Sequence, residues 1–84
     1  MAKVQVYTMK NCRFCESAKK LLGQRSIPFE TILLADDDDK AWTDLTSKSG
    51  MKTMPQIFHG DKLIGGFTEL SELDKKNQLQ ELLA

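Results

Sequence analysis

The chain has 84 residues, 12 basic and 12 acidic side chains, and a formal net charge of +0 at pH 7. This length fits one small domain, and the balanced charge disfavours a nucleic-acid-binding or membrane-surface role. No apolar stretch approaches the roughly 20 residues that cross a bilayer. No apolar segment of the kind found in a signal peptide precedes the first predicted strand, so we expect a cytoplasmic protein without a membrane or nucleic-acid partner.

The first half of the chain predicts a strand, a helix and a second strand. Residues 3–8 carry β-branched side chains at alternate positions, which is typical of a strand. Apolar residues then recur at helical spacing from Cys15, and Asn11 is the predicted N-cap of this helix. The helix ends before Pro28. Residues 29–34 form the second predicted strand, and its apolar end predicts a strand covered on both faces.

A run of four aspartates, Asp36 to Asp39, follows the second strand. A cation site is one interpretation, but the run lacks the ligand spacing, glycine and terminal glutamate of a calcium loop. Acidic residues are favoured at a helix start, and Trp42 and Leu45 follow at helical spacing. We therefore predict that a second helix begins here and ends at Gly50. With Lys40 the run also spells a protease-tag sequence, which we interpret as native because it lies between a predicted strand and a predicted helix.

The last third of the chain predicts a hairpin and a helix. Residues 55–64 contain two runs of β-forming residues around a Gly-Asp turn. Leucines at helical spacing from Leu70 to Leu83 predict the last helix, with Thr68 or Ser71 as its cap. The predicted order is β-α-β-α-β-β-α, an α/β arrangement in which a small sheet is flanked by helices.

Cys12 and Cys15 are the only cysteines, and three explanations compete for them. A closed zinc site needs four ligands, whereas the chain offers these two and His59, with no second CxxC pair. We therefore assign no metal site and interpret His59 as structural. Cys15 alone suits an inert core position. Cys12 falls at a strand-to-helix turn, where we expect its side chain to reach solvent, and this favours a redox pair.

The redox interpretation has a physical basis in the residues around the pair. A cysteine attacks as the thiolate, which the N-terminus of a helix and the neighbouring Lys10 and Arg13 favour electrostatically. A cysteine three residues later in the first helical turn is able to close a disulfide with it. A CxxC pair within a βαβ pattern is typical of a thioredoxin-like redox motif. We predict that Cys12 is the nucleophile and Cys15 the resolving cysteine.

Three motifs in chain order resemble those of the glutaredoxin family. Lys10-x-Cys12-x-Phe14-Cys15 is similar to the family's Lys-x-Cys-Pro-Tyr-Cys. Residues 52–58, Lys-Thr-Met-Pro-Gln-Ile-Phe, resemble its Arg/Lys-Thr-Val-Pro-Gln-Ile-Phe, and residues 65–70, Gly-Gly-Phe-Thr-Glu-Leu, resemble its Gly-Gly-x-Asp-x-Leu. The resemblance covers nearly the whole chain. It implies a single glutaredoxin-like domain over residues 1–84, with a thioredoxin-like fold whose four-stranded mixed sheet is flanked by helices.

The resemblance also implies a function and a ligand site. The implied function is that of a glutathione-dependent thiol–disulfide oxidoreductase, a monomer that reduces protein disulfides and glutathionylated proteins. Lys10 and Lys52 would lie near the glycine carboxylate of glutathione, and Met54 would pair with its cysteine through the backbone. A cis-proline and the N–H groups at the start of the last helix would complete the site. The implied glutathione-binding residues are Lys10, Phe14, Lys52, Thr53, Met54, Pro55, Gly66, Phe67 and Thr68.

Three residues depart from the family's pattern. Arg13 stands where the family has Pro, and we expect its permanent charge to favour the Cys12 thiolate and anionic substrates. Phe14 keeps the ring of the family's Tyr without its hydroxyl. Thr68 replaces Asp, which removes a carboxylate that could pair with the amino group of glutathione.

Two other functions suit the same resemblance. One is a redoxin reduced by thioredoxin reductase, which the lysines and the Gly-Gly-Phe-Thr segment disfavour relative to glutathione. The other is a carrier of a [2Fe–2S] cluster bridged between two protomers through the first cysteine and glutathione. Cys15 disfavours this cluster carrier because it competes by forming a disulfide.

Overall fold

The computed structural model describes residues 3–79. Its elements are β1 (Val4–Thr8), α1 (Arg13–Gln24), β2 (Phe29–Leu33), α2 (Asp39–Ser49), β3 (Gln56–His59), β4 (Lys62–Gly65) and α3 (Phe67–Lys75). This order is the one predicted from the sequence, and the predicted hairpin is formed by β3 and β4.

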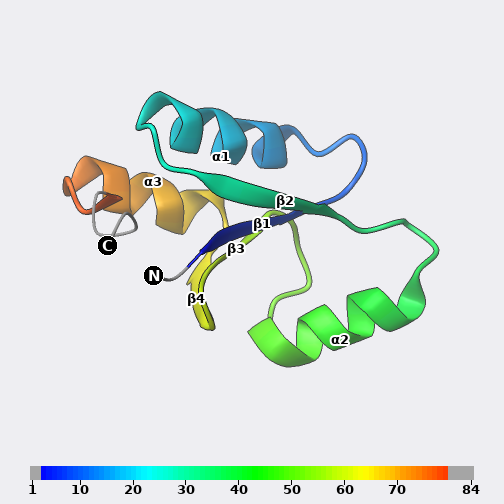
Figure 1. Cartoon of the computed structure of the whole chain (residues 1–84). Helices are drawn as coiled ribbons and strands as arrows, with labels where there is room; N and C mark the ends of the chain where they lie inside the picture. The colour runs from blue at the N-terminus through cyan, green and yellow to red at the C-terminus, as the bar shows by residue number, and fades with distance from the viewer. Residues whose placement is uncertain (1–2, 80–84) are drawn as a thin grey trace.

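The four strands form one mixed sheet in the order β2-β1-β3-β4 (Figure 1). Central β1 pairs in parallel with β2, in a register that places Val6 opposite Thr31. Its other edge pairs antiparallel with β3, where Val6 lies opposite Ile57. The predicted four-stranded mixed sheet is therefore confirmed, and its carboxyl end at β1 leads directly into the cysteine loop.

The alternating side chains of β1 divide the core into two layers. Val4 and Val6 are at most 2% exposed and pack in a cluster with buried residues of α1 and α3, among them Leu22 and Leu70. Tyr7, on the opposite face, belongs to a second cluster with residues of α2. Figure 1 shows α1 above the sheet and α2 below it. Full burial of each such aliphatic side chain stabilises the fold by about 1.5–3 kcal/mol.

The ends of α2 follow from its sequence. The side chain of Asp38 accepts a hydrogen bond from the N–H of Ala41 at 3.2 Å, so this aspartate is the N-cap. Gly50 ends the helix with a φ of 75°, which glycine adopts without the steric cost that other residues incur. The aspartate run is thus a helix start, as predicted.

The N-cap residues of the other two helices differ from those predicted from the sequence. Cys12, and not Asn11, is the N-cap of α1; Asn11 instead has a positive φ of 56° in the turn before it. Gly66, and neither Thr68 nor Ser71, is the N-cap of α3. In both cases the chain turns into the helix one or more residues away from the side chain with the better capping propensity.

Two further predictions need correction. β2 lies at an edge of the sheet, and three of its five residues are exposed, so it is not covered on both faces. Leu33, at its end, is 61% exposed. α3 ends at Lys75, although Leu79 is buried in the core beyond it. Leu82 and Leu83, predicted to extend this helix, lie outside the described residues.

Candidate active site

The first turn of α1 brings the two cysteines together. Cys12 and Cys15 form a disulfide. Sγ of Cys12 also accepts a hydrogen bond from the N–H of Cys15 at 3.2 Å, and its carbonyl accepts one from the N–H of Glu16 at 3.2 Å. Cys12 therefore lies where an N-cap side chain meets the unpaired N–H groups and partial positive charge of a helix start. Negative charge on this sulfur is stabilised by that arrangement.

The side chain of Cys12 is less exposed than the sequence analysis predicted. Only 9% of the residue is exposed, and it packs in the second core cluster with Cys15, Leu34 and Met54. The reason is the capping geometry, which folds the sulfur back over the first turn and away from solvent. Cys15 is 1% exposed, as expected for a resolving cysteine under the helix.

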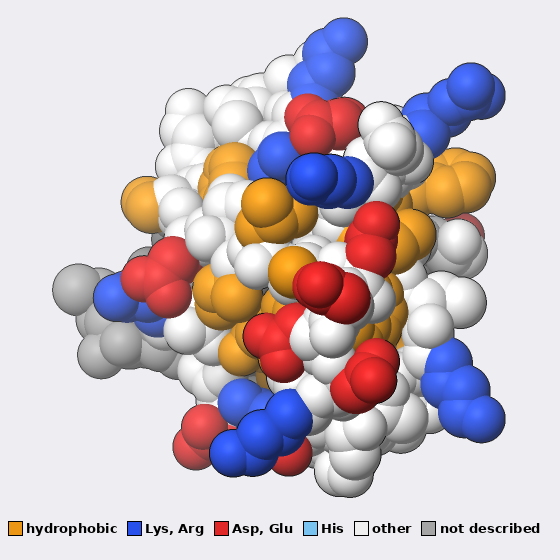
Figure 2. Space-filling view, turned by 90° about the vertical axis from the view of Figure 1, so that its right-hand side faces the viewer, with side chains coloured by type: hydrophobic (Ala, Val, Ile, Leu, Met, Phe, Trp, Pro, Cys, Tyr) orange, Lys and Arg blue, Asp and Glu red, His pale blue; other side chains and the backbone are white. Residues whose placement is uncertain are grey.

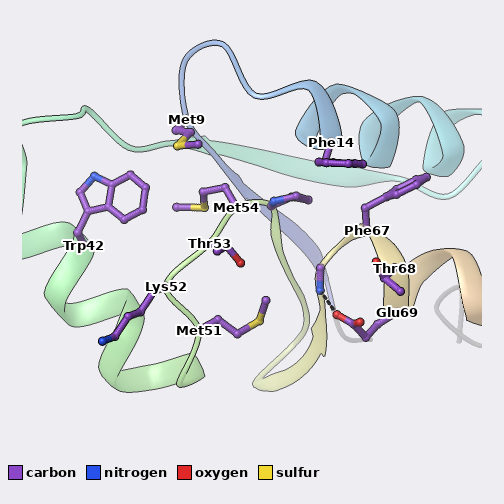
Figure 3. Close-up of a pocket in the computed structure, with 12 residues that line it drawn as sticks. Met9, Phe14, Trp42, Met51, Lys52, Thr53, Met54, Phe67, Thr68 and Glu69 are labelled. Carbon is purple, nitrogen blue, oxygen red and sulfur yellow. Dashed lines mark hydrogen bonds between the residues drawn. The ribbon is translucent and has the colours of Figure 1, made fainter.

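A groove of about 530 Å³, shown in Figure 3, lies close to the disulfide. Met54 connects the two, because it lines the groove and shares the core cluster of Cys12 and Cys15. The lining residues are Met9, Phe14, Trp42, Met51, Lys52, Thr53, Met54, Pro55, Gly66, Phe67, Thr68 and Glu69. Eight of the nine glutathione-binding residues implied by the resemblance are among them, and Lys10 is the exception.

One wall of the groove is the loop that leads into β3. The peptide bond between Met54 and Pro55 is cis, as the resemblance implies. The fully buried side chain of Gln56 donates two hydrogen bonds to this loop, to the carbonyls of Met51 and Thr53, each at 3.1 Å. Lys52 and Thr53 are exposed on the loop and contribute to the groove.

The opposite wall is the glycine pair at the start of α3. The N–H of Gly66 donates a 2.7 Å hydrogen bond to Oε1 of Glu69, drawn as a dashed line in Figure 3. A Cβ at Gly66 would lie 3.3 Å from the carbonyl oxygen of Pro55, so the two walls approach closely here. Phe67 and Thr68, the first two residues of α3, follow the pair and line the groove, at a helix start whose first N–H groups have no partner within the helix.

Aromatic side chains close the two ends of the groove. Phe14 and Phe67 stack with ring centroids 6.1 Å apart, and Phe14 is 60% exposed. Trp42 lies at the far side in Figure 3, where its Nε1–H donates to the carbonyl of Ala35 at 2.9 Å. The groove therefore offers apolar surface at both ends and backbone polar groups between them.

The charges near the disulfide are mixed. Lys52 lines the groove, whereas Lys10 in the cysteine loop and Arg13 at the start of α1 are exposed and do not line it. Asp36 to Asp39 are also exposed, and the hydrogen bond from the N–H of Leu34 to the carbonyl of Thr8 brings their segment to the same end of the sheet. Figure 2 shows acidic side chains gathered over hydrophobic ones at this end, with basic side chains around the edge.

Four lining residues were not identified from the sequence. These residues are Met9, Trp42, Met51 and Glu69. Met51 directly precedes the motif of residues 52–58, and Glu69 lies within the motif of residues 65–70 without an assigned role, so their place in or next to a motif was the available signal. Met9 and Trp42 carried no such signal, because their place depends on how the first loop and α2 pack.

Within residues 3–79 there is no group of three or more His, Cys, Asp or Glu side chains that could hold a metal ion. None of the helices in that part of the chain is long and apolar enough to cross a membrane.

Comparison with known proteins finds similarity along the chain. The family model described as Glutaredoxin matches residues 4–64. A probable glutaredoxin of Synechocystis is 40% identical over 83 residues, which cover 99% of this chain and 76% of that relative. Glutaredoxin 3 of Escherichia coli is 35% identical over 83 residues, or 99% of both chains. The crystal structure of a buckwheat glutaredoxin–glutathione complex superimposes with a TM-score of 0.87 at 28% identity, over 98% of this chain and 76% of that one. This likeness confirms the glutaredoxin form of the thioredoxin-like fold.

Proposed function

The chain belongs to the glutaredoxin family, and on that premise we propose that it is a glutathione-dependent reductase of protein disulfides and of glutathionylated proteins. Thiol–disulfide oxidoreductase activity follows from the family and the Cys12–Cys15 pair. The observation that carries the glutathione-specific part is the groove beside this pair, which gathers the backbone and side chains of three separate motifs in one place.

Reduction of a glutathionylated protein needs only Cys12. Its thiolate attacks the glutathione sulfur of the mixed disulfide, and the protein leaves as a thiolate that takes up a proton. Glutathione then stays on Cys12 as a mixed disulfide. A second glutathione thiolate attacks the sulfur of the bound glutathione, which releases oxidised glutathione and restores the Cys12 thiolate.

Reduction of a protein disulfide uses both cysteines. The Cys12 thiolate attacks one sulfur of the substrate and forms an intermolecular disulfide. Cys15 then attacks the sulfur of Cys12, which releases the reduced substrate and forms the Cys12–Cys15 disulfide present in the structure. Two glutathione molecules reduce this disulfide in two successive exchanges.

The groove suits the two carboxylates of glutathione. The ammonium group of Lys52 is available to the glycine carboxylate. The N–H groups of Phe67 and Thr68 lie at the N-terminus of α3, where a helix start attracts an anion such as the γ-glutamyl carboxylate. Met54, next to the cis bond, would pair its backbone with the glutathione cysteine. Lys10 lies outside the groove wall and would act on the ligand at longer range.

The test is a coupled assay with glutathione, glutathione reductase and NADPH on wild type, Cys12→Ser and Cys15→Ser. A glutathionylated peptide and a protein disulfide serve as the two substrates. We expect Cys12→Ser to lose both activities, and Cys15→Ser to keep the first and lose the second. Activity in Cys12→Ser, or loss of peptide deglutathionylation in Cys15→Ser, would contradict the proposed roles. Equal or faster turnover of wild type with thioredoxin reductase in place of glutathione would favour the alternative redoxin.

A further inference from the structure

Gln56 is buried behind the wall of the groove and is not among its lining residues. It is the first residue of β3, and the whole residue is 0% exposed. Both hydrogen bonds of its side chain are donated by Nε2 to carbonyls of the groove loop, those of Met51 and Thr53. Its Oε1 is buried without a hydrogen-bond partner among the described residues. The amide therefore acts through its donor group.

The loop that Gln56 contacts has little else to hold it. Within residues 3–79, no backbone–backbone hydrogen bond involves residues 51–55. Apart from Gln56, the hydrogen bonds to this loop come from Ser49, whose Oγ accepts from the N–H of Met51 at 3.0 Å and donates to its carbonyl at 3.5 Å. Both Ser49 contacts end at Met51, so Gln56 supplies the hydrogen bond that reaches Thr53.

We propose that Gln56 is a positioning residue that fixes the Met51–Thr53 loop in the shape that recognises the glutathione part of a substrate. This rests on the proposed function. One amide spans two carbonyls that lie two residues apart, so it fixes the direction in which the intervening Lys52 extends. Without the donor, both carbonyls lose this partly buried hydrogen bond, and the loop is free to adopt other shapes in which they find new partners. Loss of Gln56 should therefore affect recognition of the ligand more than the exchange reaction at Cys12, with which the Gln56 amide makes no hydrogen bond.

The experiment compares one peptide carrying either a glutathionyl or a cysteinyl group on its cysteine. The cysteinyl form has the same reacting disulfide but lacks the γ-glutamyl and glycyl groups. Gln56→Met removes the donor at similar side-chain length, and Ile57→Val is the matched control. Ile57 is the next residue of β3 and is also 0% exposed. Its side chain packs in the core cluster of Val6 and Leu22, away from the groove loop.

We expect wild type to prefer the glutathionyl peptide in kcat/KM, and Gln56→Met to reduce that preference about tenfold through KM, with kcat within about twofold. Ile57→Val should keep the preference. If Gln56→Met does not fold, Gln56→Leu serves instead, because its apolar side chain has no donor and places no charge in a buried position.

The outcomes separate the two claims. If wild type treats both peptides alike, the glutathione site itself is wrong and the role of Gln56 falls with it. If wild type prefers glutathione and the folded Gln56 variant keeps that preference, the role of Gln56 alone is overturned. An equal loss in Ile57→Val would also overturn it, because general loosening of β3 would then explain the effect.

Discussion

Arg13 occupies the first position of α1, directly after the N-cap Cys12, and its side chain is exposed. A permanent positive charge at this place adds to the partial charge of the helix N-terminus. We therefore predict that it favours the thiolate form of Cys12. The family's proline would suit the same position by its fixed φ, so the difference made by Arg13 is one of charge more than of helix geometry.

Arg13→Gln in a Cys15→Ser background tests this contribution. We expect the fraction of Cys12 present as thiolate near neutral pH to fall about twofold to fivefold, as for loss of one nearby exposed charge. The pH dependence of alkylation by iodoacetamide measures it. Lys20→Gln, an exposed charge farther along α1, is the matched control and should change little. An unchanged alkylation profile in the Arg13 variant would show that the charge does not act on Cys12.

Gly65 has a φ of 128°, a conformation that residues with a side chain rarely adopt. A Cβ there would lie 2.5 Å from Oε1 of Glu69, the atom that caps the N–H of Gly66. Gly65→Ala should therefore lower the free energy of unfolding by about 1–3 kcal/mol. Gly23→Ala, in α1 with no atom within 4 Å of the new Cβ, should raise it by about 0.5–1 kcal/mol. Urea unfolding of both variants measures these values, and an equal effect in the two would contradict the account.

The sequence predicted which residues come together better than how they are buried. The Cys12–Cys15 pair and eight lining residues of the groove followed from motifs that lie in order along the chain. The burial of Cys12 did not, because it depends on a sulfur acting as an N-cap, where Asn11 has the higher capping propensity. Trp42 was predicted only as a helix residue, because its place in the groove depends on tertiary packing.

At the scale of elements, an ion pair joins the end of α1 to α3. Arg25, the C-cap of α1, donates from Nε and a terminal nitrogen to the two carboxylate oxygens of Asp74, at 2.7 and 3.1 Å. The hydrogen bond from Arg25 is the main cause that lowers the pKa of Asp74, and the charge of the guanidinium adds to it. The two helices on the same face of the sheet are thereby linked at their outer ends.

The lowered pKa of Asp74 determines the direction in which the stability of the protein changes with pH. The carboxylate contributes stability fully above its unfolded pKa of about 3.9, and this contribution is lost as pH falls through the lower folded pKa. Asp74→Asn should therefore be slightly less stable than wild type at pH 7, and the difference should begin to shrink below about pH 4 and disappear at still lower pH, once the folded carboxylate is protonated. Urea midpoints from pH 7 to 2.5 measure it. Glu72→Gln, whose exposed partner Lys75 lies 4.0 Å away, is the control expected to show little effect. A difference that persists in acid would contradict the assignment.

Element types and their order were predictable from periodicity, whereas strand position was not. The apolar end of residues 29–34 predicted a covered strand, yet β2 lies at the edge and Leu33 is exposed. A sequence pattern shows which side chains are apolar. Whether a strand face is covered depends on which helix packs against it in the folded chain. The early end of α3 at Lys75 has a similar reason, since Leu79 reaches the core without continuing the helix.

At the scale of the whole molecule, the charge distribution opposes the proposed ligand. Glutathione is an anion, and the segment of Asp36 to Asp39 lies at the end of the sheet that carries the cysteines. These carboxylates would repel the proposed glutathionylated substrate over a distance that salt shortens. The basic side chains at the edge of the same end act in the opposite direction (Figure 2).

Asp36→Asn with Asp37→Asn tests this repulsion while leaving the N-cap Asp38 intact. We expect kcat/KM for a glutathionylated peptide to rise about twofold to threefold at low ionic strength and to return to the wild-type value near 1 M salt. An uncharged mixed disulfide should show no rise. Asp61→Asn is the matched variant, because it lies in the β3–β4 turn at the opposite end of the sheet. A rise that survives high salt would show another cause.

The central claim is that Cys12 takes the glutathione part of a mixed disulfide while the protein part leaves. The most direct measurement is a single turnover of Cys15→Ser with a glutathionylated peptide, without free glutathione, quenched in acid and mapped by mass spectrometry. We predict one glutathionyl group on Cys12 and an equal amount of released peptide thiol. The peptide itself on Cys12 with glutathione released, or no adduct on Cys12, would contradict the claim.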